Sequence, residues 1–238
     1  MRFYELEIDV NLKAPIHFQK SPEAISKMIA TALINGGYEE HYKNKPKNYV
    51  FSNLGKANKH GYFEKEGVVY FRTFKEEVIK KLASSMFDYE DNIFKTKSIK
   101  FQEVKYKKIE SIMSINPVFI VMKKNDKFWT YQESNGDLTI LVNALQDNLI
   151  RKYEDIFKEK IYPKNNFMEY FEIKNHKPQT FFYKGSKFFG NKIYLKPRDD
   201  EISQKLAFVA IGSGLGHKNS SVGGGFVKWQ DRRGKWNI

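Results

Sequence analysis

The same order of predicted elements occurs twice along this chain, and that repetition constrains its fold more than any other feature. In the first half, apolar–polar alternation and helical periodicity predict elements in the order β-α-β-β-α-β. These elements are predicted at residues 2–13, 21–37, 48–54, 68–74, 76–87 and 98–110. Within the second helix, for example, Val78, Ile79 and Leu82 share one face, as a helix packed on a sheet requires.

The second half repeats this order of elements, although its amino-acid sequence shows no similarity to that of the first half. Its elements are predicted at residues 114–124, 137–160, 168–175, 179–197, 201–212 and 225–230. Two βαββαβ units in succession predict an α+β protein of two ferredoxin-like domains in tandem, with boundaries at 1–115 and 116–238. This architecture carries many functions, so the function must be argued from particular residues.

Charge and composition favour a polyanionic partner. The chain carries a formal net charge of +13, and 16% of its residues are aromatic. Basic residues attract phosphates, and aromatic rings stack on unpaired bases, so the combination suits RNA. A lysine-rich chain with a well-filled core has the same composition, and composition alone does not separate the two interpretations. The absence of cysteine excludes disulfides, thiolate chemistry and cysteine-ligated zinc. We expect a cytoplasmic protein that does not engage a membrane, because neither a secretory signal nor a long apolar run is present.

The segment GSGLGHKNSSVGGGFVKW, residues 212–229, holds six glycines within fourteen residues. A nucleotide-binding fingerprint is excluded, because the segment follows a predicted helix instead of opening one and lacks the Gly-Lys-Ser/Thr of a P-loop. Two interpretations remain. The glycines either end the helix and turn the chain into the last strand, or they let the main chain approach RNA phosphates. We favour the second, in which the residues contacting RNA are Gly214, Gly216, His217, Lys218, Asn219, Ser220, Gly223, Gly224 and Gly225.

This segment also resembles a known family. The run from G-x-G-x-G through Lys-Asn-Ser to G-G-G-F-V resembles the glycine-rich loop of the CRISPR-associated RAMP proteins. It is most similar to that of the Cas-six-type endoribonuclease, which cuts precursor CRISPR RNA. PIHFQKSPEAISKMI and YVFSNL, near the N-terminus, resemble the first strand, first helix and second strand of that family. Between residues 75 and 200 no family-specific motif occurs, and the loop motif is less specific to the cutting enzyme than to RAMP proteins in general.

The resemblance implies a metal-independent cleavage in which a 2′-hydroxyl attacks the adjacent phosphate. The products are a 2′,3′-cyclic phosphate and a 5′-hydroxyl, and no cofactor takes part. The family places its catalytic histidine between the first helix and the second strand, where this chain has His41. In that family, a lysine follows the catalytic histidine by a few residues. Lys47 matches that spacing best, and Lys43 and Lys45 stay open.

One catalytic group departs from the family pattern. Many members carry a tyrosine in the first helix, where this chain has none and Ser26 lies near the corresponding place. Tyr42, beside His41, is the proposed substitute, with Tyr38 as a second candidate. Histidine suits the proton transfers because its ordinary pKa of about 6.5 allows both gain and loss of a proton near neutrality.

The other histidines and the acidic clusters have simpler interpretations. Among the histidines, only His217 is a serious rival to His41 for catalysis; His17 and His60 suit packing or loop roles, and His176 suits RNA contact. The lysines over 170–197 are either a phosphate-binding stripe or a solvated strand edge. We expect the acids at 39–40 to be solvated and those at 199–201 to cap the following helix, so no metal site is predicted.

The sequence therefore predicts an endoribonuclease whose partner is CRISPR repeat RNA within precursor crRNA. The main alternative is a non-catalytic RNA-binding RAMP subunit of a crRNA effector complex, which the glycine-rich segment and the charge serve equally well. A third interpretation, a ferredoxin-like enzyme acting on small molecules, predicts no salt-dependent RNA binding. The sequence leaves open whether the protein forms a homodimer or joins an effector complex.

Overall fold

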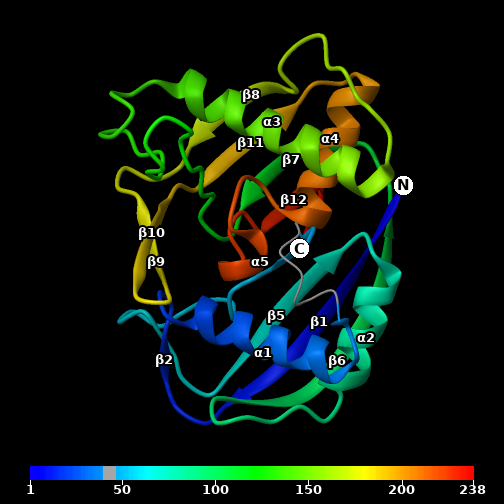
Figure 1. Ribbon diagram of the computed structural model, residues 1–238, viewed down its shortest axis with the longest axis vertical. Coiled ribbons are helices and arrows are strands. Elements are labelled where there is room, and N and C mark those ends of the chain that lie inside the picture. Colours follow the sequence, from blue (N-terminus) through cyan, green and yellow to red (C-terminus); the bar gives the residue numbers. More distant parts are fainter. Residues whose placement is uncertain (40–46) are drawn as a thin grey trace.

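The computed structural model describes residues 1–39 and 47–238, which form two α/β units, the N-terminal one in the lower half of Figure 1. The N-terminal unit consists of β1 (Arg2–Leu12), α1 (Ser21–Asn35), β3 (Tyr49–Phe51), β5 (Glu66–Thr73), α2 (Glu76–Met86) and β6 (Phe94–Lys105). Its strands form one antiparallel sheet in the order β3-β5-β1-β6. A small two-stranded sheet of β2 (Ile16–His17) and β4 (Tyr62–Phe63) lies beside it.

The C-terminal unit repeats this plan. It consists of β7 (Ile109–Ser114), α3 (Leu138–Phe157), β8 (Met168–Ile173), β11 (Ile193–Pro197), α4 (Glu201–Ser213), α5 (Asn219–Val222), β12 (Val227–Asp231) and β13 (Trp236–Asn237). Its antiparallel sheet has the order β13-β12-β7-β11-β8. A hairpin of β9 (Gln179–Tyr183) and β10 (Ser186–Gly190) is inserted before β11 and reaches the N-terminal unit, where the Phe182 N–H donates to the Gln19 carbonyl at 2.9 Å.

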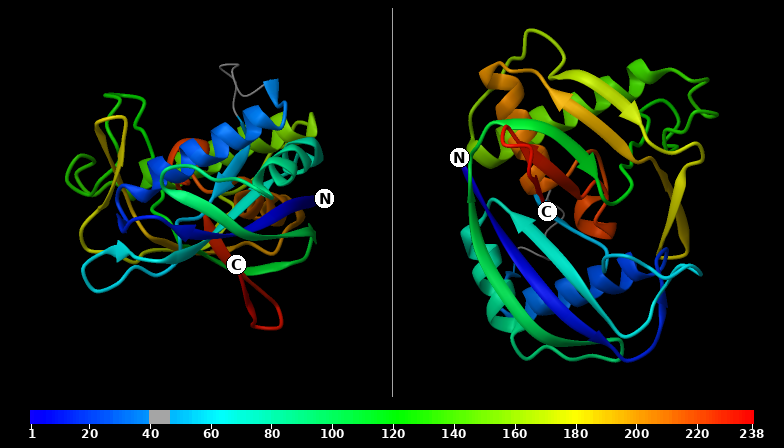
Figure 2. Two further views of the ribbon diagram at one scale, coloured as in Figure 1. Left: turned by 90° about the horizontal axis from the view of Figure 1, so that it is seen from below. Right: turned by 180° about the vertical axis from the view of Figure 1, so that it is seen from behind.

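In both units the fourth strand of the βαββαβ order lies beside the first, followed by the third and the second, with β13 added at one edge of the second sheet. This is the strand order of a ferredoxin-like fold. In Figure 1 the helices α1, α2 and α3 lie in front of the strands, and Figure 2 (right) looks onto the strands from behind. The predicted α+β class with two ferredoxin-like units is confirmed.

One predicted strand is wrong. The sequence placed the first strand of the second half at residues 114–124, whereas β7 spans Ile109–Ser114 and residues 117–124 make only isolated bridges, such as Phe119 to His217. Pro117 has no N–H to donate and interrupts the ladder at this point. β7 pairs in the second sheet, although it precedes residue 115, the predicted end of the first domain. The chain therefore passes from the first sheet to the second between residues 105 and 109.

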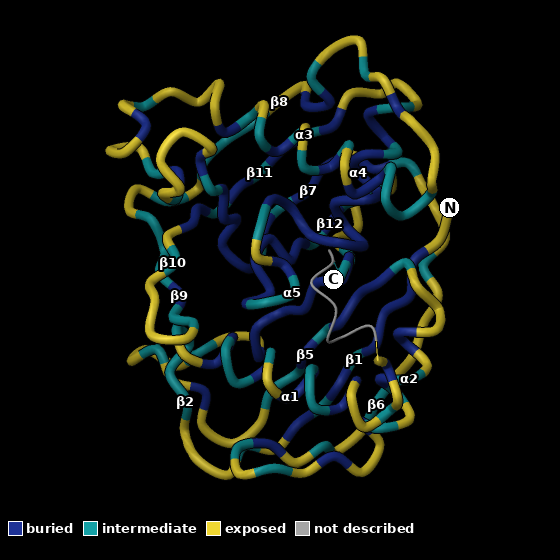
Figure 3. Tube along the Cα trace, viewed as in Figure 1, coloured by how far each residue is buried: buried dark blue, intermediate teal, exposed yellow. Residues whose placement is uncertain are grey.

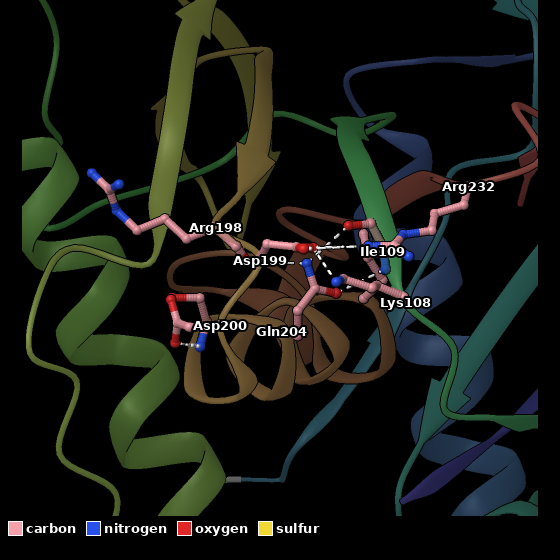
Figure 4. A network of polar contacts seen from close by, with 8 residues as sticks. Lys108, Ile109, Arg198, Asp199, Asp200, Gln204 and Arg232 are labelled. Carbon is pink, nitrogen blue, oxygen red and sulfur yellow. Dashed lines mark hydrogen bonds and ion pairs between the residues drawn. The ribbon is translucent and has the colours of Figure 1, made fainter.

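Figure 4 shows how the start of β7 is held against α4. The Gln204 side chain accepts from the Ile109 N–H at 2.8 Å and donates to the Ile109 carbonyl at 3.0 Å. Asp199 forms ion pairs with Lys108 and Arg232, and Asp200 caps α4 by accepting from the Ser203 N–H at 2.9 Å. The predicted capping role of this acidic cluster is therefore confirmed for Asp200.

Each unit has its own apolar core, and a buried arginine joins the two. Arg72 of β5 is fully buried and pairs with Glu5 of β1. Its guanidinium also donates to the Val227 carbonyl at 2.7 Å and to the Ile211 carbonyl at 3.3 Å, and it lies 4.3 Å from the centre of the Phe226 ring. These contacts fix the end of α4 and the start of β12 against the N-terminal sheet, so the glycine-rich segment between them has a defined place. No helix within residues 1–39 and 47–238 has the length and apolar character to cross a membrane.

Candidate RNA-binding and catalytic site

The glycine-rich loop, defined here as residues 214–225, leaves the end of α4, turns through α5 and enters β12. Most of it is buried between the two units, as the dark trace around α5 and β12 in Figure 3 shows. Gly214, Gly216, Gly223, Gly224 and Gly225 are all buried, whereas the Lys218 side chain is exposed and His217 and Ser220 are half-buried. The polar residues of the loop, and not its glycines, therefore present most of its accessible surface.

Close packing explains why glycine occupies two of these positions. A Cβ atom on Gly223 would lie 2.2 Å from the Phe51 carbonyl oxygen of β3, and one on Gly225 would lie 1.9 Å from the Leu215 carbonyl oxygen. Both residues also have φ near +65°, at +63° and +65°, which L side chains rarely adopt. The packing role considered for the sequence is thus present in the structure. Main-chain contact of the glycines with RNA stays a prediction.

A buried lysine from α3 holds the loop from inside. The Lys152 ammonium group donates to the Gly214 carbonyl at 2.6 Å, the Gly216 carbonyl at 3.1 Å and Asn219 Oδ1 at 2.8 Å. The Asn219 amide in turn donates to the carbonyls of Leu215 and Gly224, at 3.1 and 2.6 Å. Burial and, to a smaller degree, the charge of Arg151 lower the Lys152 pKa to about 7. The Asn219 side chain, predicted to donate to RNA, is thereby engaged within the loop.

His217 is held by the segment that follows β7. The backbone N–H of His217 donates to the Phe119 carbonyl at 2.7 Å, and Nδ1 of its ring accepts from the Val121 N–H at 3.0 Å. Burial is the main cause that lowers the pKa of His217 to about 4, and the positive charges of Lys152, Arg151 and Lys218 lower it further. The ring is therefore neutral at pH 7, and because Nδ1 accepts, Nε2 carries the proton. In this state His217 is a hydrogen-bond donor and not a general base.

A cavity of about 620 Å³, here called the Lys47 cavity, brings this loop together with the segment before β3. Its walls come from residues 47–49, Val121 of the segment after β7, one face of α3, and residues 216–221. Lys47 thus lines the same space as His217, Lys218, Asn219 and Ser220, although it lies about 170 residues away in sequence. The predicted catalytic residues His41 and Tyr42 lie outside the described residues.

The charges around the Lys47 cavity suit a phosphate. Among the described residues, the cations Lys47, Arg151, Lys152 and Lys218 line it, together with one carboxylate, that of Asp155. Burial acts to raise the Asp155 pKa, but hydrogen bonds from Lys158 and Asn48 outweigh it, so the pKa lies below its ordinary value and the group stays ionised. Burial lowers the pKa of Lys47. A cluster of cations in a partly desolvated hollow stabilises the negative charge of a phosphate and of a phosphorane.

Comparison with solved structures gives matches along nearly the whole chain. A RAMP protein described as binding different RNA substrates superimposes with a TM-score of 0.74 at 17% identity, covering 96% of this chain and 100% of the other. A Cas6-related protein from Pyrococcus furiosus gives a TM-score of 0.72 at 17% identity, covering 97% and 99%. A CRISPR-associated protein Cas6 gives 0.66 at 18% identity, covering 94% and 98%. The chain has the fold of the Cas6 and RAMP proteins.

The resemblance noted in the sequence is therefore confirmed at the level of fold. No protein-family model matches the chain, and no curated protein matches it in sequence. At identities of 17–18%, the likeness shows a shared Cas6 and RAMP fold but does not assign roles to individual residues. The roles of the residues in the Lys47 cavity must be argued from their own geometry.

Sequence reasoning missed the contribution of α3 to this site. Asn148, Arg151, Lys152 and Asp155 all line the Lys47 cavity. Their spacing of three, four and seven residues from Asn148 puts them on one face of the helix. This polar stripe runs beside the apolar stripe of Leu141, Leu145 and Leu149, and that pattern was the signal available in the sequence.

The remaining histidines lie away from the cavity. His17 packs against the rings of Phe18 and Tyr62, with ring centres 4.7 and 5.1 Å away, which agrees with its expected packing role. His60 and His176 are exposed in loops. In the part of the chain that the structure describes, no three or more histidine, aspartate or glutamate side chains gather as metal ligands would.

Proposed function

We propose that this protein is a metal-independent endoribonuclease that binds CRISPR repeat RNA in precursor crRNA and cuts within it. The observation that carries the proposal is the Lys47 cavity, in which a lysine of the N-terminal unit and the polar residues of the glycine-rich loop line one basic hollow. The similar solved structures include a RAMP protein described as binding different RNA substrates and several Cas6 proteins, and this supports an RNA ligand.

The proposed reaction is an attack of the RNA on itself. The 2′-oxygen forms a bond to the adjacent phosphorus, the bond from phosphorus to the 5′-oxygen breaks, and a 2′,3′-cyclic phosphate and a 5′-hydroxyl result. One proton leaves the 2′-hydroxyl and one joins the 5′-oxygen. His41 and Tyr42, a few residues before the cavity wall in sequence, are the proposed proton-transfer groups.

The cavity residues have electrostatic roles in this reaction. Lys47 and Lys218 supply positive charge to the phosphorane, whose oxygens gain negative charge as the 2′-oxygen attacks. Nε2–H of the neutral His217 and the Ser220 hydroxyl are donors for the non-bridging oxygens. His217 is thus proposed to bind phosphate, and the proton transfers are assigned to His41.

A non-catalytic RAMP subunit of a crRNA effector complex is the second candidate. One observation favours it: α1, at Ser21–Asn35, carries none of the tyrosines that many Cas6-type enzymes have there. A basic cavity beside a glycine-rich loop serves RNA binding without cleavage equally well. Under either proposal we place the protein in the cytoplasm, where its RNA is transcribed, and leave open whether it acts as a homodimer.

Single-turnover cleavage separates the two candidates. The protein is mixed in excess with labelled CRISPR repeat RNA in EDTA, and a matched RNA carries one 2′-deoxy sugar at the cut site. We expect the first RNA to be cut and the second to be bound but left intact. Loss of cleavage in His41→Ala with binding retained supports the assignment of His41. Tight binding without cleavage of either RNA would support the effector-subunit function.

A further inference from the structure

The C-terminal unit contains a second hollow that the proposed reaction does not use. It has a volume of about 580 Å³ and lies between residues 127–133, the loop at 176–178 and strand β10. We call it the aromatic pocket, because Phe128, Tyr131 and Phe189 line it.

The rings of this pocket are open to solvent and yet held in place. Tyr131 is 67% exposed and Phe189 is 38% exposed, so both rings are accessible to a ligand. The Tyr131 ring packs over Gly136, where a Cβ atom would lie 3.0 Å from Cε1 of the ring. The Gly136 N–H also donates to the Tyr131 carbonyl at 2.8 Å. Phe128 is anchored on Phe188, with ring centres 5.0 Å apart. The pocket therefore offers a prearranged apolar face to a planar ligand.

Basic and hydrogen-bonding side chains surround these rings. Lys127, Lys187 and His176 line the pocket together with Thr130 and Gln132. Lys127 pairs with Glu133 at 2.9 Å, which positions its ammonium group at the rim. An aromatic face beside lysines, a histidine and the Gln132 amide matches the chemistry of an unpaired nucleotide: the base stacks on the rings, the phosphate lies near the cations, and the base edge forms hydrogen bonds with the polar groups.

A third hollow of about 660 Å³ lies beside both this pocket and the Lys47 cavity. It shares Val121, Arg151 and His217 with the Lys47 cavity and Glu133 with the aromatic pocket. Lys123 and Lys124 line it, together with the carboxylates of Glu133 and Asp147. The three hollows therefore adjoin one another through shared lining residues, so a single RNA strand that occupies the candidate phosphate site can also contact the aromatic pocket.

We propose that the aromatic pocket binds an unpaired nucleotide of the same RNA whose phosphate lies in the Lys47 cavity, stacking its base on Tyr131. This inference rests on the proposed function for the presence of RNA and adds a second contact point to it. The nucleotide occupies a fixed distance along the strand from the cut site, so the pocket sets the register in which the repeat is held.

Binding of cleavage-blocked RNA tests the inference. Repeat RNA with a 2′-deoxy sugar at the cut site is titrated against wild type, Tyr131→Ala and Tyr131→Phe, and then shortened from each end in turn. We expect Tyr131→Ala to bind full-length RNA about tenfold more weakly, the loss associated with one stacked base, and Tyr131→Phe to bind normally. The difference between wild type and Tyr131→Ala should vanish once shortening removes the unpaired nucleotide.

Tyr162→Ala is the matched control, because Tyr162 is 76% exposed and lines none of the three hollows. Equal affinities of wild type and Tyr131→Ala, or an equal loss in Tyr162→Ala, would overturn the inference. Cleavage of the all-ribose RNA together with equal affinities would leave the endoribonuclease proposal standing and remove only the pocket. A Tyr131-dependent affinity without any cleavage would support the pocket and contradict the endoribonuclease proposal. An absence of RNA binding by wild type would contradict both proposals.

Discussion

The ammonium nitrogen of Lys152 lies 2.8 Å from Oδ1 of Asn219, and this hydrogen bond joins α3 to the centre of the glycine-rich loop. The same ammonium group also donates to two loop carbonyls, those of Gly214 and Gly216. We predict that Lys152→Met destabilises the protein by about 1–3 kcal/mol, because buried acceptors lose their donor. Urea denaturation measures this loss, and faster amide hydrogen exchange over residues 213–225 would locate it.

Lys160→Met is the control for this prediction. Lys160 follows the same helix, and its ion pair with Glu154 is at the surface, with 70% of the lysine side chain exposed. A surface pair of this kind contributes little to stability. If Lys152→Met were as stable as Lys160→Met and exchanged its loop amides at the wild-type rate, the internal role of Lys152 would be refuted.

His217 makes stability depend on pH in a defined window. Its pKa is lowered from 6.5 to about 4, so between these pH values the unfolded chain binds a proton that the folded chain does not. Its contribution is fully present above pH 6.5 and falls as the pH decreases toward 4, by about 1.4 kcal/mol per pH unit. We predict that, as the pH falls from 6.5 toward 4, wild type loses stability relative to His217→Asn.

Asparagine is chosen because its side-chain oxygen accepts from the Val121 N–H as Nδ1 of His217 does, without titrating. Urea denaturation at intervals from pH 4.5 to 7.5 supplies the two stability curves. His60→Asn removes an exposed histidine and controls for the general loss of a charge. Parallel curves for wild type and His217→Asn would contradict the buried, neutral state of His217.

Gly225 and Gly185 separate two reasons for using glycine. Both have positive φ, +65° and +75°, but a Cβ atom on Gly225 would lie 1.9 Å from the Leu215 carbonyl oxygen, whereas one on Gly185 would meet nothing within 4 Å. We predict that Gly185→Ala costs only the backbone strain, about 1–2 kcal/mol, and that Gly225→Ala costs several kcal/mol more. Thermal or urea unfolding of the two variants measures the difference. Equal losses would show that conformation alone selects glycine at position 225.

Much of the fold was predictable because its elements are local and periodic. The helix α3 has leucines at 141, 145 and 149, and α4 begins at an aspartate cap, so their bounds follow from short stretches of sequence. The strand β7 was misplaced because the segment after Pro117 is as apolar as the strand before it. Apolar character there reflects burial beneath the glycine-rich loop, as for Phe119, and burial does not require a sheet.

The site was predictable only in part because it is built from segments that are distant in sequence. Lys47 and the glycine-rich loop each have a local signal, whereas their meeting depends on how the two units pack through Arg72. The inward direction of Asn219 was also beyond the sequence, since an asparagine beside a lysine and a serine reads as a surface residue. Its partner Lys152 is buried, which is rare for a lysine side chain.

Lys47 tests the catalytic proposal most directly. If it stabilises the phosphorane, Lys47→Ala should reduce the single-turnover cleavage rate by about 10²–10³-fold, the loss found when one such group is removed, with a smaller effect on RNA affinity. Lys47→Arg should retain part of the rate because its charge is kept. Lys56→Ala, at an exposed position of the same unit, should cleave at the wild-type rate.

The pH profile of the same reaction gives an independent measure of Lys47. Because burial lowers its pKa below 10.5, the charged and active form is lost at a lower pH than for an exposed lysine. We therefore expect the wild-type rate to fall on the alkaline side as the pH rises through that lowered pKa, and the fall to disappear in Lys47→Arg, whose guanidinium stays charged. A fall of the same size at the same pH in both proteins would assign the titration to another group and remove Lys47 from the chemical step.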